Sequence, residues 1–482
     1  MNVRNQEGNT FLEVSSSVNG KKISKRKHAP YRRTEKNGDT LTPIMIFKRI
    51  QGEKKFLLES SFPHERKGRY SYIGADPYLE IIGRADETKV INRKTSEEKT
   101  YAMHALEYIA TYLPNIQTDI PLPFTGGAIG YVGYDALRHF VDIGDDLPND
   151  LDMPDLHFMV YDTIVAYEHR KEKLHIIAMN IEDEAERLLE EKINRIEKAL
   201  ETTSPIEAPD VEPLNFQAEI APEDFIKKVE RAKDYIAKGE VEQLVLSQRL
   251  VAELKGDPVS YYRKLRSKNP SPYMFYIDFG PYLVLGSSPE SLIQTYGEKV
   301  ITNPIAGTRP RGKTPEEDEA FKAELLSDQK ERKEHDMLLA LSKEEIAPIC
   351  EEGSLEVPVY REVVRYEHVM HLVSEVHGKL KADATAIDAL LRCLPAGTVS
   401  GTPKKRAMQL INELESLRRG VYAGGIGFIS FSHDVNLAIT IRSLLIKDGR
   451  AYIQAGAGIV ADSIPEEEYA ETLHKARSLL EM

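Results

Sequence analysis

The sequence lacks the features that mark secreted, membrane-bound and zinc-binding proteins. Its 482 residues include only two cysteines, Cys350 and Cys393, both in apolar surroundings and without the spacing of metal ligands. We therefore expect two buried thiols in a reducing compartment. No apolar run approaches the roughly 20 residues of a membrane helix, and no secretory signal peptide is recognisable. These absences predict a cytoplasmic protein that does not cross a membrane.

The chain has fewer basic than acidic residues. The formal net charge is −13 at pH 7, with 77 acidic residues against 64 basic ones. Phosphate binding needs a basic face, so this balance argues against nucleic acid as a partner, and an anionic substrate would need a local cation. Hydrophobic residues at 41% and charged residues at 29% are ordinary for a globular protein.

Changes in composition divide the chain into four parts. Residues 1–30 are polar, and the basic run Lys21–Arg33 near their end is typical of a frayed terminus. Residues 203–214 carry three prolines among acidic residues, which indicates an extended linker. The linker separates an N-terminal domain, residues 31–202, from a second domain, residues 215–482.

Strand-like and helical segments are interleaved through both domains. A helix is expected over about residues 182–202, and another should begin at Pro222 and end at Gly239. The expected strands include 56–60, 70–73, 78–82, 158–167, 174–179, 243–254, 273–279, 283–287 and 300–305. Because many strands are adjacent in the sequence, the pattern favours an α+β sandwich over a doubly wound parallel sheet.

Two pairs of glutamates stand three residues apart within predicted helices. Glu331 and Glu334 lie in QKERKEH, and Glu468 and Glu471 follow the helix-starting Pro465. Residues at i and i+3 share a helix face, so each pair presents two carboxylates on one side. If the two faces meet, they form an all-oxygen site of the kind that suits Mg²⁺. Taken alone, each pair is more typical of a solvated helix face.

Several loops could bind an anion. Gly307 and Thr308, in PIAGTRPRG, expose backbone N–H groups, although a lone glycine turn is weak support. The loop before Pro403 leads into a helix, and its positive end suits either a carboxylate or a simple cap. AGAGI, from Ala455 to Ile459, permits close approach to the backbone or a packed strand end. Arg442 stands in an apolar strand, so a structural carboxylate or a substrate must pair with it.

Taken together, these motifs resemble anthranilate synthase component I, a family of chorismate-utilising enzymes. The resemblance covers nearly the whole chain, with family domains at about 32–196 and about 224–480. The matching motifs, in the family's order, are SSPESL, PIAGTRPRG, KERKEH, VMHLVSEV, PAGTVSGTPK, RRGVYAGGIG, IRSL, QAGAGIVADS and YAETLHKA. The implied fold is a sandwich of two packed, largely antiparallel β-sheets flanked by helices.

The resemblance implies a reaction and its site. Chorismate and ammonia would give anthranilate and pyruvate in tryptophan biosynthesis, with Mg²⁺ as cofactor. The implied metal ligands are Glu334 and Glu471, supported by Glu331 and Glu468. The implied substrate contacts are Gly307, Thr308, Tyr422, Arg442, Gly456, Ala457 and Gly458. His371 would be the general acid/base that protonates the departing hydroxyl, with Thr398 as a neighbouring polar contact.

Two positions distinguish this reaction from those of sister enzymes. Ala306 stands where aminodeoxychorismate synthases commonly place a nucleophilic lysine. Gln243 stands where isochorismate and salicylate synthases place the lysine that activates water. The absence of both lysines favours ammonia as the nucleophile.

The family also implies partners and feedback regulation. Neither cysteine lies in a nucleophile motif, so a separate glutamine amidotransferase subunit, anthranilate synthase component II, would supply ammonia, in a heterotetramer. L-tryptophan would inhibit from a pocket between the two domains. Its implied contacts are Glu59, Ser60, Pro272, Tyr273 and Met274, although an edge strand packed on a proline-rich turn would also explain them.

One stretch departs from the family pattern. After KERKEH the family usually continues as MLVDLGRND, whereas this chain has MLLALSKEE, with Ala340, Lys343, Glu344 and Glu345 as changes. His474 replaces the usual asparagine of ETLNKA. Three alternatives therefore stay open: aminodeoxychorismate synthase component I, a weakly catalytic subunit that binds chorismate or tryptophan, and a non-enzymatic acidic scaffold.

Overall fold

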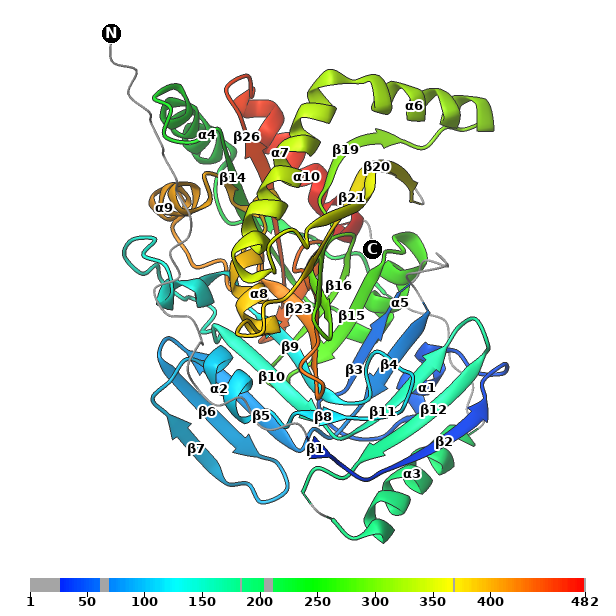
Figure 1. Ribbon diagram of the computed structural model, residues 1–482. Helices are drawn as coiled ribbons and strands as arrows, with labels where there is room; N and C mark the ends of the chain where they lie inside the picture. Colours follow the sequence, from blue (N-terminus) through cyan, green and yellow to red (C-terminus); the bar gives the residue numbers. More distant parts are fainter. Residues whose placement is uncertain (1–26, 61–68, 183, 203–210, 367–368, 481–482) are drawn as a thin grey trace.

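Two large β-sheets dominate the fold (Figure 1). The computed structural model describes residues 27–60, 69–182, 184–202, 211–366 and 369–480. Each sheet has 12 strands, and every pairing within the two sheets is antiparallel. The predicted sandwich of antiparallel sheets with flanking helices is confirmed.

Both sheets run across the predicted domain boundary. The first sheet has the order β19 (Ile305–Pro310), β21 (Val369–Lys379), β18 (Lys299–Thr302), β17 (Ser291–Tyr296), β24 (Val435–Ile439), β23 (Gly425–Ser430), β9 (Gly127–Val132), β10 (Leu156–Tyr161), β5 (Leu79–Arg84), β6 (Glu87–Asn92) and β7 (Glu98–Tyr101), with β20 (Glu356–Arg365) beside β21. At its centre β23 of the C-terminal half pairs with β9 of the N-terminal half, and Gly427 lies opposite Gly130.

The second sheet is built in the same way. Its order is β13 (Gln217–Ala218), β14 (Gln243–Glu253), β26 (Arg450–Ile459), β25 (Ser443–Lys447), β16 (Tyr282–Ser288), β15 (Tyr273–Asp278), β3 (Phe56–Glu59), β4 (Tyr70–Gly74), β11 (Thr163–Glu168), β12 (Lys173–Met179) and β2 (Tyr31–Asn37), with β22 (Gly401–Thr402) beside β14. Here β15 joins β3 across the boundary. Two-residue strands β1 (Lys27–His28) and β8 (Ile116–Gln117) form a small parallel pair apart from both sheets.

Helices cover the sheets where apolar stripes on both elements meet. The α-helices are α1 (Pro43–Arg49), α2 (Ala105–Tyr112), α3 (Glu186–Leu200), α4 (Pro222–Ala237), α5 (Pro258–Lys268), α6 (Pro315–Ser327), α7 (Gln329–Ile346), α8 (Ala386–Cys393), α9 (Lys404–Leu414) and α10 (Pro465–Leu480). Helix α4 begins at Pro222 as predicted, and Gly239, with φ +75°, follows its end. Phe225, Val229 and Ala232 bury its apolar stripe against β14 and β26.

The largest apolar cluster contains side chains from both sheets, for example Phe56 and Val284 with Ile129 and Phe158. A second cluster joins the outer face of the second sheet to α1, α3, α5 and α10. Burial of large aliphatic and aromatic side chains on both faces is the main stabilising contribution. Cys350 and Cys393 are free and buried.

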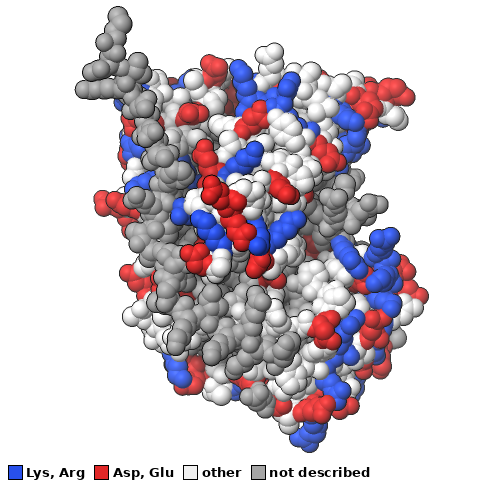
Figure 2. Space-filling view, in the orientation of Figure 1, with Lys and Arg blue, Asp and Glu red and all other residues white. Residues whose placement is uncertain are grey.

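Two predicted segments lie largely outside the described residues. Of the N-terminal segment 1–30, only residues 27–30 are described, and of the linker 203–214 only residues 211–214. Leu214 is buried in the apolar cluster beside the second sheet. Among the described helices, none has the length and apolar character needed to cross a membrane. The face in Figure 2 carries acidic and basic side chains interspersed with one another.

Candidate active site

A cavity of about 370 Å³ lies in the C-terminal half of the chain. Strands β14, β19, β21 and β26 supply part of its wall, and helices α7 and α10 supply another part. These elements lie together in the upper half of Figure 1. Most of the residues singled out from the sequence line this cavity: Gly307, Thr308, Glu334, His371, Thr398, Tyr422, Arg442, Gly456, Gly458, Glu468 and Glu471.

Helices α7 and α10 present carboxylates to this one cavity. Glu334 of α7 and Glu468 and Glu471 of α10 line it, whereas Glu331 is turned to an ion pair with Arg309 at 3.0 Å. Burial, together with the charge of Glu331 one turn earlier, raises the pKa of Glu334. Among the described residues Glu334 has no ion-pair partner, so a cation in the cavity would relieve its desolvation.

The carboxylates are not gathered into a closed metal site. Ser463 donates a hydrogen bond to Glu468 at 2.6 Å, and Lys475 lies 3.5 Å from Glu471. Across the described residues, no three His, Cys, Asp or Glu side chains are close enough together to hold a metal ion. The donor set is nevertheless all oxygen and rich in carboxylate, which fits Mg²⁺, and Mg²⁺ commonly takes only one or two protein carboxylates and completes its shell with substrate and water.

Arg442 is one of two cationic side chains that line the cavity, with Lys475. It was predicted within a strand, but this is wrong: β24 ends at Ile439, β25 begins at Ser443, and Arg442 occupies the turn between them with φ +52°. Its guanidinium donates to the carbonyl oxygen of Lys475 at 2.6 Å and has no carboxylate within ion-pair distance among the described residues. Burial lowers its pKa. An enclosed guanidinium with free donors is suited to a ligand carboxylate.

His371 lies on β21 with one ring nitrogen fixed by the neighbouring turn. Its Nδ1 is 2.9 Å from the carbonyl oxygen of Gly307 and 3.1 Å from the hydroxyl of Thr308. A carbonyl oxygen only accepts, so Nδ1 carries the hydrogen and Nε2 keeps its lone pair in the neutral ring. Burial lowers the pKa of His371, which favours this neutral form.

Glu290 is a cavity residue that the sequence reasoning missed. It follows β16 in the SSPESL motif, and Thr398 donates a hydrogen bond to its carboxyl at 3.0 Å. Burial raises the pKa of Glu290 to about 7, more than the bond from Thr398 lowers it. The only signal in the sequence was the motif itself, because nothing local shows that this turn is enclosed by protein.

Backbone without side chains forms another part of the wall. A Cβ on Gly456 would approach the Tyr422 hydroxyl to 2.7 Å, and one on Gly458 would approach Gln243 to 2.6 Å. Glycine at both positions therefore opens space in the cavity. Ala457, between them, points the other way and packs with α4 and α9, so its side chain does not line the cavity. Ala306 and Gln243 both line it.

A buried ion pair ties several parts of this wall together. Arg419 donates to both carboxylate oxygens of Glu415, at 2.6 and 2.8 Å. Its other donors reach the carbonyl oxygens of Val399 at 2.7 Å and Val245 at 2.8 Å. The guanidinium also lies over the ring of Tyr422, 5.5 Å from its centroid. Val245, Val399 and Tyr422 all line the cavity.

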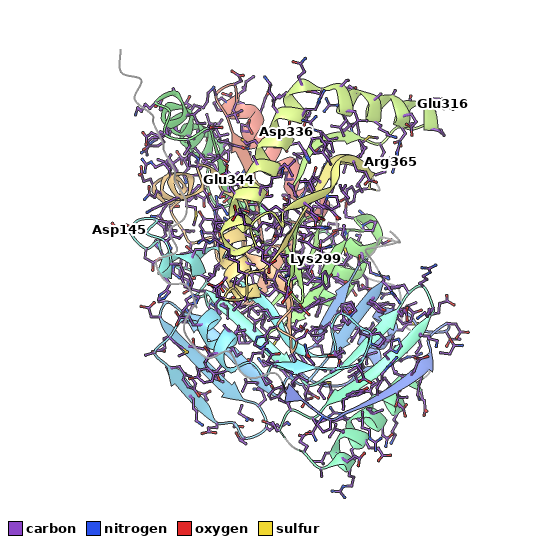
Figure 3. All side chains as sticks on the ribbon, in the orientation of Figure 1. Asp145, Lys299, Glu316, Asp336, Glu344 and Arg365 are labelled. Carbon is purple, nitrogen blue, oxygen red and sulfur yellow. The ribbon has the colours of Figure 1, made fainter. Side chains whose placement is uncertain are left out.

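The stretch that departs from the family pattern lies mainly on the outer side of α7. Ala340 and Glu344 are exposed, and Glu344 is labelled on this helix in Figure 3. Glu345 instead turns inward and forms an ion pair with the buried Lys404 of α9. His474 is exposed on α10. None of these four side chains lines the cavity.

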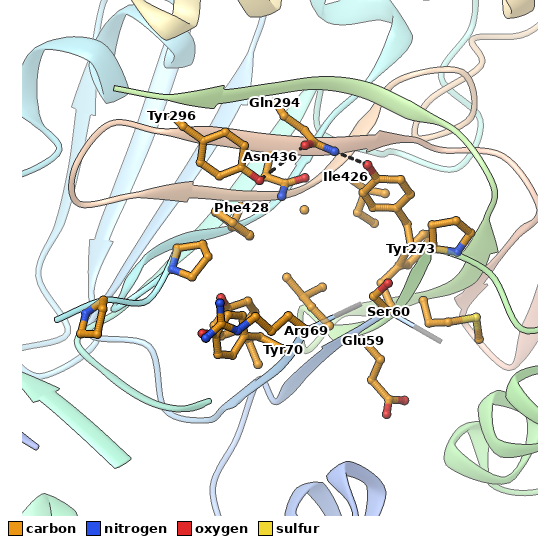
Figure 4. Close-up of a pocket in the computed structure, with 18 residues that line it drawn as sticks. Glu59, Ser60, Arg69, Tyr70, Tyr273, Gln294, Tyr296, Ile426, Phe428 and Asn436 are labelled. Carbon is orange, nitrogen blue, oxygen red and sulfur yellow. Dashed lines mark hydrogen bonds between the residues drawn. The ribbon is translucent and has the colours of Figure 1, made fainter. Parts of the chain in front are cut away.

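A second cavity, of about 410 Å³, lies where β3 meets β15 (Figure 4). All five side chains assigned to the tryptophan pocket line it: Glu59, Ser60, Pro272, Tyr273 and Met274. The Glu59 carboxylate points away from the middle of the cavity, toward α5, where Tyr262 donates to it at 2.7 Å and Arg266 lies 3.0 Å away. Burial raises the pKa of Glu59.

The sequence reasoning missed the opposite wall of this second cavity. Gln294, Tyr296 and Asn436 lie together there, with Tyr296 donating to Gln294 at 3.4 Å and Gln294 bonded to Tyr273. Gln294 and Asn436 are register partners across β17 and β24. Their strands continue to the first cavity, since Glu290 immediately precedes β17 and Arg442 follows β24.

Comparison with known proteins identifies the class of enzyme. The chorismate binding enzyme family matches residues 53–481. The chain therefore belongs to the chorismate binding enzyme family, as its motifs predicted.

Several relatives at about 40% identity are named anthranilate synthase component 1. Anthranilate synthase component 1 of Lactococcus lactis is 42% identical over 453 residues, which is 93% of this chain and 98% of the relative. The enzyme of the same name from Acetivibrio thermocellus is 43% identical over 458 residues, with 92% of each chain covered. The crystal structure of anthranilate synthase component I from Streptococcus pneumoniae superposes with a TM-score of 0.81 at 42% identity, covering 92% of this chain and 98% of that one.

The buried pair of Arg419 and Glu415 can be tested by mutation. Arg419→Met leaves the Glu415 carboxylate enclosed without its partner, so we expect the free energy of unfolding to fall by about 3–5 kcal/mol. Denaturant unfolding followed by circular dichroism measures this loss. The matched control is Arg187→Met, which breaks an exposed i,i+4 pair with Glu191 at 3.4 Å and should change stability by less than about 1 kcal/mol. Equal losses in the two variants would contradict the role given to Arg419.

Proposed function

We propose that this chain is the chorismate-converting subunit of an anthranilate synthase, which forms anthranilate, pyruvate and water from chorismate and ammonia with Mg²⁺. One observation carries the proposal. A single cavity contains an enclosed guanidinium, three helix carboxylates, a protonatable buried carboxyl and a neutral imidazole. This inventory suits a dianionic substrate that must lose a hydroxyl group, and the similarity to named anthranilate synthase components selects the reaction.

Substrate binding divides between the two charged parts of the cavity. Arg442 and the open backbone at Gly456 and Gly458 are suited to the carboxylate of the enolpyruvyl group. Glu334, Glu468 and Glu471 would hold Mg²⁺, with Glu331 behind them. When bound, the metal would supply positive charge that stabilises the ring carboxylate and the negative charge that develops on it during the reaction. The acidic wall would otherwise repel the substrate.

Departure of hydroxide needs a proton, and we propose Glu290, which Thr398 holds in the cavity wall, as its donor in place of His371. Burial raises the pKa of Glu290 to about 7, so a substantial fraction of this carboxyl is protonated near neutral pH. His371 was assigned this role from the motif, but its lowered pKa makes the neutral ring the resting form. Its Nε2 lone pair suits the opposite task, removal of the ring proton when the product becomes aromatic.

The nucleophile is external to the chain. The methyl group of Ala306 cannot attack the ring, and the amide of Gln243 cannot deprotonate water. Ammonia is small enough to enter beside them and needs only its own lone pair. An aminodeoxychorismate synthase is less well supported because it commonly uses a lysine at the position of Ala306.

Partners and regulation complete the proposal. A glutamine amidotransferase subunit would deliver the ammonia in a heterotetramer, in keeping with the "component 1" name of the relatives. L-tryptophan would bind in the second cavity, where stacked aromatic and proline side chains can hold an indole ring and Asn436 and Gln294 can hold its polar groups. The two free buried thiols support a cytoplasmic location.

The central experiment uses the purified chain alone. We expect incubation with chorismate, Mg²⁺ and an ammonium salt at alkaline pH to give fluorescent anthranilate, identified by chromatography. A chelator should abolish the product and added Mg²⁺ should restore it. Glu334→Gln and Glu471→Gln should each raise the Mg²⁺ concentration needed for half-maximal rate at least tenfold. Formation of aminodeoxychorismate, or binding of chorismate without conversion, would instead support one of the alternatives.

The assignment of the acid predicts a pH dependence. An acid must be protonated to act, so kcat/KM for chorismate at a fixed concentration of free ammonia should fall as pH rises through about 7, the pKa of Glu290. Glu290→Gln should lower kcat by about 10²–10⁴-fold and remove this falling limb. His371→Ala should slow turnover with little effect on chorismate binding and should keep the limb. A limb that persists in Glu290→Gln and vanishes in His371→Ala would reverse the two roles.

Feedback binding gives a further prediction. Millimolar L-tryptophan should raise the melting temperature and inhibit turnover, because binding to the folded protein stabilises it by mass action. Asn436→Leu removes a polar group from the second cavity. It should raise the tryptophan concentration needed for both effects at least tenfold and leave the uninhibited rate unchanged. D-tryptophan is the matched ligand control. Unchanged melting temperature and activity would remove tryptophan from this cavity.

A further inference from the structure

A small chamber of about 40 Å³ lies behind the wall of the catalytic cavity. Glu290, Leu338 and Thr398 line both spaces, so the proposed proton donor stands in their common wall. The catalytic cavity must exclude water when substrate fills it. The chamber is a second space from which Glu290 can be reached.

The chamber contains buried polar groups without partners. Asn303 is 3% exposed, and neither its amide nitrogen nor its amide oxygen has a hydrogen-bond partner among the described residues. The hydroxyl of Thr302, which is 4% exposed, has none either. Leaving such groups unpaired in the interior is energetically costly. A polar chamber of this size is large enough for a water molecule, and one water typically makes about three hydrogen bonds.

Three titratable side chains line the chamber, Glu290, Glu345 and Cys393. Glu345 lines it from α7 and is paired with the buried Lys404 of α9. Cys393 lines it from α8, and Lys475 of α10 acts on Glu290 through its charge. The Glu345 side chain is 12% exposed, and Ser342 on the same helix is also partly exposed. Lys404 also donates to the carbonyl oxygen of Arg392 at 3.2 Å, which fixes the pair in place.

Resting on the function proposed above, we infer that Asn303 and Thr302 bind water in this chamber, and that this water returns the proton that Glu290 loses in each turnover. Glu290 gives its proton to the hydroxyl group that leaves chorismate as water. The chamber water then gives a proton to the Glu290 carboxylate as it receives one from a hydronium ion on the Glu345 side. One carboxylate and one hydronium ion become one carboxylic acid and one water, with no change in electrons.

The altered sequence stretch takes part in this chamber. Ser342 and Glu345 both line it, at positions where the family pattern MLVDLGRND has glycine and aspartate. Each change adds polar or longer side-chain atoms on the α7 side of the chamber. The departure from the pattern therefore modifies the proton path to Glu290 rather than the substrate cavity itself.

Two variants test the role of the chamber. Asn303→Leu replaces an unpartnered amide with an apolar side chain of similar size, and Thr302→Val removes only a hydroxyl. We expect each to lower kcat about tenfold, with KM for chorismate changed by less than twofold and with a larger solvent deuterium isotope effect on kcat. The melting temperature should change little, because neither side chain bonds another protein group among the described residues and no protein partner is left behind. A purely structural residue would instead lower it.

A matched control and a direct observation complete the test. Asn115→Leu replaces another buried asparagine with an unpartnered amide oxygen, far along the chain from the cavity, and should leave kcat and the isotope effect unchanged. A high-resolution crystal structure should show water bonded to Asn303 and Thr302. The inference would be overturned if kcat and the isotope effect were unchanged in both chamber variants, or if the crystal structure showed no water bonded to Asn303 and Thr302. Absence of anthranilate formation by the unmodified chain would refute the proposed function instead.

Discussion

The bidentate bond between Arg419 and Glu415 is the constraint on which the catalytic wall depends. A charge pair in the interior is costly to desolvate, and it persists only where its remaining donors and acceptors are satisfied. Here the guanidinium donors that are not used by Glu415 reach two backbone carbonyls, and Ser247 donates to Glu415 with both its backbone N–H and its hydroxyl, each at 2.9 Å. The pair thus fixes β14, the turn at Val399 and helix α9 relative to one another.

This fixed wall explains how distant segments make one site. Glycines in β26 and the ring of Tyr422 can approach closely because the Arg419 guanidinium supports that ring from behind. Glu290 and His371 are both enclosed, but burial moves their pKa values in opposite directions because it disfavours the charged form of each. The same burial therefore favours the protonated carboxyl of Glu290 and the neutral imidazole of His371.

Much of the fold and part of the site could be predicted from the sequence. Proline and glycine bounded α4 correctly, and i,i+3 spacing correctly predicted that Glu468 and Glu471 face one cavity. Arg442 was placed in a strand because its neighbours are apolar, and only its left-handed backbone revealed the turn. Glu290 was missed because enclosure comes from residues far away in the chain. The orientation of the Glu59 side chain also could not be predicted, because it is set by Tyr262 and Arg266 of α5.

The linker at residues 203–214 divides the sequence into halves but does not divide the folded structure into separate sheets. Each sheet continues from one half into the other through β9 with β23 and β3 with β15. During synthesis β9 leaves the ribosome before β23 is made. Until then, the edge of β9 that pairs with β23 stays unpaired, and the apolar residues beside it are not yet covered. Exposed edges of this kind invite association with other chains. Assembly of this enzyme in the cell is therefore a late event, which becomes possible only when almost the entire polypeptide has been made.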